Sequence, residues 1–422
     1  MNNLFKIDLQ KNKISRDGTI MGKIEDFQES IMKRHEDLEL NLLKKSPLKS
    51  SCTREVIIHD RHKNIDKKLL MFGSNNYISA AFQQEAIQKA ISVTEEYGIG
   101  SGGVPLLSGT TIFQCELERV ISETKGFDDA IIFSSGFTAN IGVLLGLMRP
   151  NNLIIHDKLN HASLIDGTIM AGTKMLRYKH NDPQSLEKLL AENHHIYPDG
   201  ILVVTDGVFS MDGDIANIPE ILKVVKKYNA LLLIDDAHAT GVIGEKGAGT
   251  LSHFNIKDHS NIIVTGTLSK AIGCVGGFIT AEQKIIDYLR IFARSNMYST
   301  SLPPSVCASA IEIFKYMKSS DAVEQLKDNS IYLRNKLAQK GIDTLNSETA
   351  IIPIVIGDEY KLTMMSKDFL EKGIVVNYIF PPVVSPKLSR IRISLMSSHT
   401  KKDLDYLVNS ISEVLTKYEI TN

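Results

Sequence analysis

The sequence predicts an α/β fold with a mostly parallel sheet, because short apolar runs alternate with helical patterns from about residue 70. Five apolar runs have the length of buried strands: DAIIF at 129–133, NLIIHD at 152–157, GILVVTDG at 200–207, LLLIDD at 231–236 and NIIVTG at 261–266. One helical face lies between two of these runs and consists of Ile218, Ile221, Leu222, Val225 and Tyr228. Pro219 suits the first turn of that helix. We therefore expect helices that cover a parallel sheet.

The chain is expected to divide into three parts, because its 422 residues exceed the usual size of one domain. After about residue 310, longer charged helical segments accompany the strand-like stretches IIPIVI and RIRISL, which indicates a smaller α+β domain. Before Pro47, apolar residues recur at helical spacing: Ile24, Phe27, Ile31, Leu38 and Leu42. We predict an N-terminal arm with an amphipathic helix at 1–69, a large domain at 70–310 and a C-terminal domain at 311–422.

The arm helix is expected to pack on the chain's own body or on a second subunit. A membrane surface is the alternative, but the acidic residues of this segment disfavour it. The whole chain has 48 basic and 49 acidic residues, which argues against nucleic acid as a partner. No apolar run approaches the roughly 18 residues that span a bilayer, and the N-terminus lacks the apolar core of a secretory signal. We expect a cytoplasmic protein without a membrane span.

The cysteines give no indication of a metal site or a disulfide framework. Cys52, Cys115, Cys274 and Cys307 lie far apart and form no CxxC pair. We expect all four to be packing residues in a reducing compartment, and we expect no metal.

Two chemically active side chains follow neighbouring strand-like runs. Asp235 follows LLLI, and Lys270 follows NIIVTG after Thr267 and Ser269. Open parallel sheets bind ligands beyond the carboxyl ends of their strands, so both residues are expected at one pocket. A carboxylate and a lysine at one pocket are what pyridoxal phosphate requires. The acid keeps the ring nitrogen protonated, and the lysine forms an imine with the aldehyde.

Other segments add to this interpretation, although each is weak alone. FSSGFTAN at 133–140 passes from a strand into a helix, where the N–H groups of Ser135, Gly136 and Phe137 are placed to hold a phosphate. His161 is a candidate to lie flat on the cofactor, with a structural histidine as the alternative. Ser210 is a candidate donor to a cofactor oxygen, with an ordinary turn serine as the alternative.

The joint occurrence of several segments resembles the α-oxoamine synthase family of pyridoxal-phosphate enzymes. The segments are NNYISA, GIGSGG, LSGTT, SSGFTAN, NHASLIDG, TDGVFSMDGD, IDDAHATGVIG, GTLSKAIG and YSTSLPP. The likeness extends from about residue 70 to the C-terminus. It implies fold type I, with a mostly parallel seven-stranded sheet in the large domain, and pyridoxal 5'-phosphate as the cofactor.

The resemblance also implies a role for each matching residue. The expected catalytic residues are Lys270 as the imine-forming lysine, Asp235 at the ring nitrogen, His161 stacked on the ring and His238 at the phenolic oxygen. The remaining cofactor contacts are expected from Ser210 at the phenolic oxygen and, around the phosphate, from Thr267, Ser269, Ser135, Gly136, Phe137 and the adjacent Asn140. Thr300 is expected to reach the phosphate of a second subunit, because family members are homodimers with active sites at the interface.

The substrate's carboxylate is expected between Asn75 and Arg392. A guanidinium can bind a carboxylate through two parallel hydrogen bonds, which supports this role for Arg392 independently. Its neighbour Arg390 is the competing candidate.

The implied reaction is a decarboxylative Claisen condensation of a small amino acid with an acyl-CoA, which releases an α-amino ketone, CoA and carbon dioxide. The ending RIRISLMSSHT and the arm resemble bacterial serine palmitoyltransferases, which favours serine over glycine or alanine. The alternatives are 2-amino-3-ketobutyrate CoA ligase and 8-amino-7-oxononanoate synthase activity. Val104-Pro105 and Gln114 depart from the family pattern and leave the acyl donor open. A catalytically inactive partner subunit and an aminotransferase are the remaining hypotheses.

Overall fold

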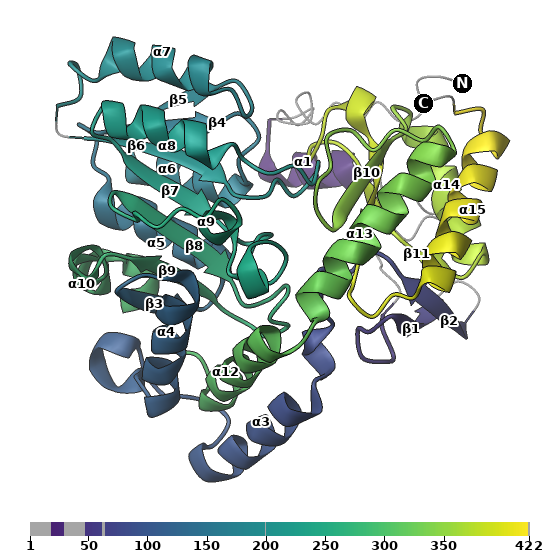
Figure 1. Ribbon diagram of the computed structural model, residues 1–422, viewed down its shortest axis with the longest axis horizontal. Coiled ribbons are helices and arrows are strands. Elements are labelled where there is room, and N and C mark those ends of the chain that lie inside the picture. The colour runs from purple at the N-terminus through teal and green to yellow at the C-terminus, as the bar shows by residue number, and fades with distance from the viewer. Residues whose placement is uncertain (1–17, 29–46, 61–63, 199, 421–422) are drawn as a thin grey trace.

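The computed structural model describes residues 18–28, 47–60, 64–198 and 200–420. A seven-stranded sheet with helices on both faces forms the large half, and two three-stranded sheets with helices form a smaller half beside it (Figure 1). The predicted α/β class and the smaller α+β region are therefore confirmed.

The large sheet is parallel except for one strand. Its order is β3-β9-β8-β7-β6-β4-β5, and β9 runs antiparallel to both neighbours, β3 and β8. The strands are β3 (Asp129–Phe133), β4 (Leu153–Asp157), β5 (Lys174–Tyr178), β6 (Ile201–Asp206), β7 (Leu231–Asp235), β8 (Ile262–Thr267) and β9 (Gly277–Ala281). All five strand-like runs of the sequence correspond to strands, and β5 and β9 are the two that the sequence did not indicate.

Helices bury both faces of this sheet, which explains the continuous apolar runs of its central strands. On one face, α7 (Pro183–Asn193) and α8 (Ile218–Lys227) pack against alternate strand residues such as Leu232 and Ile234. On the other face, α5 (Gly136–Leu147), α6 (Ala162–Ala171) and α10 (Gln283–Phe292) pack against Leu233 and its neighbours. The expected covering helix is α8. Figure 1 shows α8 and α6 on opposite sides of the strands.

The remaining elements of the large half surround the sheet. They are α3 (Gln84–Tyr97), α4 (Ile112–Lys125), α9 (Thr250–His253), α11 (Arg294–Met297) and α12 (Pro304–Ser319). The smaller half contains α13 (Ala322–Gln339), β10 (Ile351–Val355), α14 (Glu359–Glu371), β11 (Ile374–Val375), β12 (Asn377–Ile379), β13 (Arg390–Ser394) and α15 (Lys401–Lys417).

Part of the predicted N-terminal arm belongs to the smaller half. Strands β1 (Glu55–Asp60) and β2 (Ile65–Met71) pair with each other, and β2 pairs with β11. Val56, Ile58, Leu69 and Met71 are buried in one cluster, so this segment lies in a core and is not a separate arm. The other limits of the three predicted parts stay predictions.

Only a short helix is described before residue 47. It is α1 (Ile20–Phe27), in which the Ile24 side chain is exposed. Ile31, Leu38 and Leu42 lie outside the described residues, so the length of the amphipathic helix stays a prediction. No helix in the described ranges is long and apolar enough to cross a membrane.

A buried ion pair fixes the loop after β7. The Lys125 ammonium donates to Asp236 Oδ2 over 2.8 Å and to Thr240 Oγ1 over 2.7 Å, and both charged side chains are 2% exposed. Asp236 also accepts hydrogen bonds from Thr250. The buried ion pair and the hydrogen bonds of Asp236 thus fix the loop that follows Asp235.

We expect Lys125→Met to lower the free energy of unfolding by about 3 kcal/mol, because Asp236 would stay buried without its cation. Denaturant unfolding followed by circular dichroism measures this change. Lys257→Met is the control, since Lys257 is exposed and should change stability by less than about 0.5 kcal/mol. Equal midpoints for the two variants would show that the pair contributes no stability.

Candidate active site

A cavity of about 230 Å³ lies at the carboxyl ends of β6, β7 and β8. Ten predicted site residues line it: Ser135, Gly136, Phe137, Asn140, His161, Asp235, His238, Thr267, Ser269 and Lys270. Ser163, Asp206, Val208 and Ala237 complete the lining. The sheet therefore brings together residues that are far apart in the sequence, as the strand-end rule predicts.

Lys270 follows β8 and is partly buried in this cavity. Desolvation lowers the pKa of its amine to about 8, although the attraction of Asp235 opposes the shift. A lysine with this pKa is partly neutral near physiological pH. It can therefore act as a nucleophile or as a base.

Asp235 is the last residue of β7, and its side chain is 6% exposed. Asn140 Nδ2 donates to one carboxylate oxygen over 2.7 Å, and the backbone N–H of Ala237 donates to the other over 2.9 Å. Both donors are neutral groups, and they fix the position of the carboxylate. It can stabilise a protonated ring nitrogen.

Two histidines line the cavity. His161 caps α6, where its Nδ1 lies 2.7 Å from Ser163 Oγ. His238 is buried, and burial together with the nearby Lys270 holds its pKa well below the usual value. Burial also lowers the pKa of His161. Both rings are thus biased toward the neutral form.

The start of α5 can hold a phosphate. Ser135 caps this helix, and the N–H groups of a first helical turn lack intrahelical partners. A Cβ at Gly136 would lie 3.0 Å from Thr267 Cβ, so glycine allows the helix end to approach β8. The hydroxyls of Thr267 and Ser269 lie 2.8 Å apart beside it. Backbone and hydroxyl donors at this end, with Asp235 and Lys270 at the other, fit pyridoxal phosphate.

The structure also distinguishes Arg392 from Arg390. Arg390 donates to Asp212 Oδ1 over 2.6 Å, so its charge is neutralised. Arg392 is 4% exposed and contacts the Ser210 carbonyl, Ser394 Oγ and Asn75 Oδ1. Within the described ranges no carboxylate pairs with Arg392. A buried guanidinium without an anionic partner is suited to bind a carboxylate.

The comparisons with known proteins agree with this geometry. The family model described as aminotransferase class I and II matches residues 67–411. An 8-amino-7-oxononanoate synthase of Thermoanaerobacter pseudethanolicus is 40% identical over 349 residues, 82% of this chain and 88% of that protein. A serine palmitoyltransferase of Sphingobacterium spiritivorum is 38% identical over 375 residues, 89% of this chain and 92% of that protein. The solved structure of Sphingomonas wittichii serine palmitoyltransferase has a TM-score of 0.86 at 28% identity, covering 94% and 99% of the two chains.

The chain belongs to the α-oxoamine synthases, within the class I and II aminotransferase family. It is accordingly a pyridoxal-phosphate-dependent acyltransferase with fold type I, and a related serine palmitoyltransferase structure contains this cofactor. The cofactor and the enzyme class expected from the sequence are confirmed.

Not every expected contact lies in the cofactor cavity of this α-oxoamine synthase. Ser210 lies beside Arg392, which donates to its carbonyl oxygen over 2.5 Å, and it does not line the cavity. Thr300 is exposed and lines a separate small cavity together with Pro105 and Gln114. The two sequence departures at Val104-Pro105 and Gln114 therefore lie near the residue expected to serve a second subunit.

The loop that carries Ser210 is held by charged contacts. His180 lies 2.9 Å from both Asp157 and Asp214. Although burial disfavours the cation, hydrogen bonds to these two carboxylates raise the pKa of His180 to about 10. The pair Arg390–Asp212 holds the same loop from the smaller half. Ser210 is thereby kept beside Arg392.

Sequence reasoning did not single out three polar residues of this site. Asp206 ends β6 opposite Asp235, and its carboxylate accepts the His161 N–H over 3.2 Å. Burial and the neighbouring Asp235 raise its pKa well above the usual value. The position of Asp206 at the end of a strand-like run could have indicated it as a site residue from the sequence. Ser163 and Tyr77 contact His161 and His238, and only the three-dimensional arrangement reveals them.

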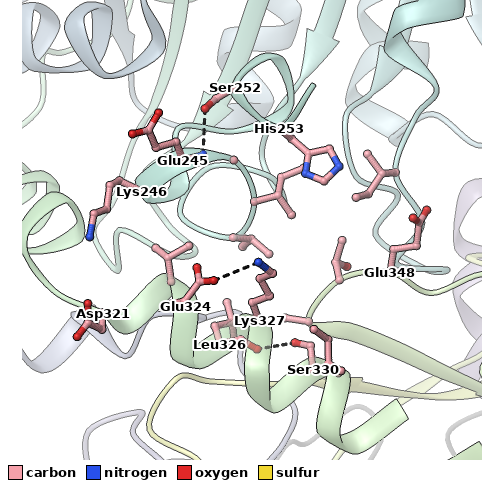
Figure 2. A pocket seen from close by; sticks show the side chains of 18 of the residues that line it. Glu245, Lys246, Ser252, His253, Asp321, Glu324, Leu326, Lys327, Ser330 and Glu348 are labelled. Atoms are coloured by element: carbon pink, nitrogen blue, oxygen red, sulfur yellow. Dashed lines mark hydrogen bonds and ion pairs between the residues drawn. The ribbon is translucent and has the colours of Figure 1, made fainter. Parts of the chain in front are cut away.

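A second cavity of about 580 Å³ is larger than the cofactor cavity but differs in chemistry (Figure 2). It lies between α13 and the segment at 242–253, which ends in α9, and acidic and basic side chains are mixed on its walls. Glu324 and Lys327 are neighbours on α13 and pair over 3.1 Å. Lys246 and Lys327 are exposed, so this cavity offers no desolvated amine beside a carboxylate.

Proposed function

We propose that this α-oxoamine synthase condenses a small amino acid with an acyl-CoA thioester, giving an α-amino ketone, CoA and carbon dioxide. The observation that carries the proposal is the placement of Lys270 and Asp235 in one cavity, with the unpaired Arg392 beside it. Lys270 and Asp235 serve the cofactor, while Arg392 serves the substrate's carboxylate.

Each residue of the site has a separate role in this proposal. Arg392 and Asn75 orient the amino acid through its carboxylate, and Lys270 Nζ removes the proton from the α-carbon. With the cofactor bound, Asp235 would stabilise positive charge on the ring nitrogen, and His161 would cover the ring face. Ser135, Gly136, Phe137, Thr267 and Ser269 would hold the phosphate, and Asn140 positions Asp235. When bound, pyridoxal phosphate supplies the electron sink that makes this proton removable.

Serine is the amino acid we favour, with glycine and alanine as alternatives. The relatives include both serine palmitoyltransferases and 8-amino-7-oxononanoate synthases at similar identity. Absorbance titration with each amino acid tests the choice, because only a substrate should change the cofactor spectrum at low concentration. Mass measurement of the amino ketone identifies the acyl chain.

Release of free CoA separates this proposal from the other hypotheses. An aminotransferase would transfer nitrogen to a keto acid without consuming acyl-CoA. A catalytically inactive partner subunit would release no CoA at all, although the presence of Lys270, Asp235 and His161 disfavours that role.

We further propose a homodimer in which Thr300 reaches the phosphate site of the partner. Several exposed apolar residues lie in the segments around Thr300, and the most exposed are Ile99, Leu107, Ile112 and Tyr298. Hydrogen bonds between Ser101 and Ser301 and between Gly103 and Ser301 join these segments. Large exposed apolar groups that lie together indicate an interface.

We expect Arg392→Met to raise the KM for the amino acid by about a hundredfold, because the substrate's carboxylate would lose its cation. The stability of the variant should change little by comparison, which unfolding curves can check. Arg390→Lys is the matched control, and its KM should change by less than about threefold since Asp212 already neutralises this position. Equal KM changes in the two variants would show that the substrate's carboxylate does not bind at Arg392.

A further inference from the structure

His180 joins two carboxylates that belong to different segments of the large half. Its Nδ1 lies 2.9 Å from Asp157 Oδ1, and its Nε2 lies 2.9 Å from Asp214 Oδ2. Asp157 ends β4, whereas Asp214 lies in the loop between β6 and α8. The side chains of Asp157 and Asp214 are 0% and 8% exposed, so water compensates either carboxylate poorly for a lost partner. His180 therefore ties this loop to the sheet.

Only the protonated form of His180 can donate to both carboxylates. A neutral imidazole carries one N–H, so one of the two contacts would place a lone pair against a negative oxygen. Although burial disfavours the cation, the hydrogen bonds to both aspartates raise the pKa of His180 to about 10. The ring of Phe209 packs against the imidazole at nearly a right angle, with 4.4 Å between the ring centroids. His180 is thus a cation in a fixed position.

The loop that contains Asp214 is a closed turn, and Ser210 lies inside it. Val208 and Ile215 form an antiparallel bridge at the base of the turn. The N–H of Phe209 donates to the Asp214 carbonyl over 3.0 Å, so these two residues are paired across the turn. Ser210 comes directly after Phe209 in the chain. A displacement of Asp214 would therefore displace Ser210 as well.

Ser210 in turn orients the guanidinium of Arg392. The Nε–H of Arg392 donates to the Ser210 carbonyl over 2.5 Å, and Nη1 donates to Ser394 Oγ over 2.8 Å. The contacts of its two terminal nitrogens with Asn75 Oδ1 are long, at 3.3 and 3.4 Å. Because the guanidinium is planar, the short bond at Nε fixes the direction in which the terminal nitrogens face. These nitrogens keep hydrogens for a carboxylate.

We propose that His180 is a positioning residue that sets the affinity for the amino acid's carboxylate, because it holds Ser210 against Arg392. The role rests on the proposed function, which assigns that carboxylate to Arg392. His180 does not itself line the cofactor cavity. Its loss therefore weakens binding of the amino acid and leaves proton removal by Lys270 nearly unchanged.

His180→Gln tests this role, because glutamine has no charge and cannot present N–H groups on two sides as the ring does. We expect KM for the amino acid to rise about tenfold, the effect of weakening one hydrogen bond to a charged group. The values of kcat and of KM for acyl-CoA should change less than about threefold. His59→Gln is the control, since the pair of His59 with Asp66 lies near the surface and should not affect KM. An unchanged KM, or a fall in kcat as large as the rise in KM, would overturn the proposal.

A double-mutant cycle shows whether the effect passes through Arg392. In the Arg392→Met background, His180→Gln should change KM for the amino acid by less than about twofold. The same tenfold rise in both backgrounds would show that His180 acts elsewhere and would overturn the proposal. Absorbance titration of the holoenzyme measures the same affinity without the condensation. A titration about tenfold weaker in His180→Gln, together with no release of CoA by the wild type, would refute the proposed function and retain the positioning role.

A second test does not depend on the folding of His180→Gln, in which two buried aspartates lose their cation. Asp214→Asn keeps the size of the side chain and weakens its bond to His180, so we expect KM for the amino acid to rise about threefold or more. Nitrogen-15 spectra of histidine-labelled wild-type holoenzyme at about pH 8, where an ordinary histidine is neutral, should show both ring nitrogens of His180 protonated. The signal is assigned by its change in Asp214→Asn. A neutral His180 in the wild type, or an unchanged KM in Asp214→Asn, would contradict the role.

Discussion

Lys270→Ala is expected to abolish covalent attachment of pyridoxal phosphate and to lower kcat by at least about a thousandfold. The variant loses both the amine that joins the cofactor and the base whose pKa is lowered to about 8. Borohydride reduction followed by peptide mass measurement locates the attachment in the wild type. Single-turnover release of CoA measures the loss of rate.

Lys257→Ala is the control for this experiment, because Lys257 is an exposed lysine outside the cavity. It should keep full activity and normal labelling of Lys270. If Lys270→Ala remained yellow and fully active, another lysine would have to hold the cofactor, and the assignment of the whole cavity would be wrong.

Asp235→Asn is expected to have the second largest effect, a fall in kcat/KM of about a thousandfold, or about 4 kcal/mol. The amide keeps the size of the side chain but removes the charge that stabilises a protonated ring nitrogen. Steady-state kinetics measure the fall. The absorbance of the purified variant shows whether the cofactor is retained, which separates weaker cofactor binding from slower chemistry.

Asp206→Asn provides the contrast within the same cavity. Burial beside Asp235 raises the pKa of Asp206 and favours its neutral acid, so an amide is a close substitute in charge. We expect its effect to be less than about tenfold. A larger loss in Asp206→Asn than in Asp235→Asn would exchange the roles of the two carboxylates.

The sequence predicted the central part of the fold because strands buried on both faces are continuously apolar. The runs that form β6, β7 and β8 are of this kind. Asp235 ends β7 and Lys270 follows β8, so the ends of these two runs indicated both residues. Strand β5 was missed because it is an edge strand, in which Lys174 and Arg177 are exposed. Strand β9 was missed because it has only two large apolar residues, among glycine, threonine and alanine, and so does not form a continuous apolar run.

The resemblance predicted most of the candidate site, whereas the contacts between its residues required the structure. The proposed carboxylate site is an example, since only the structure shows that Arg390 pairs with Asp212. Tyr77 gave no sequence signal because buried tyrosines are common in cores. The segment at 55–71 was misplaced because β2 pairs with β11, whose Ile374 lies opposite Leu70, a relation between distant residues that local pattern cannot show.

The exposed cations of β5 have a consequence for association between molecules. This strand ends the large sheet, and among the described residues only β4 pairs with it, so its outer edge is a template on which another chain can pair. Two copies approaching edge to edge would bring Lys174 and Arg177 of each molecule together in a poorly solvated seam. Mutual repulsion and desolvation oppose such a ribbon. Pairing of two molecules through β5 is thereby disfavoured, so the homodimer that we propose would use another surface.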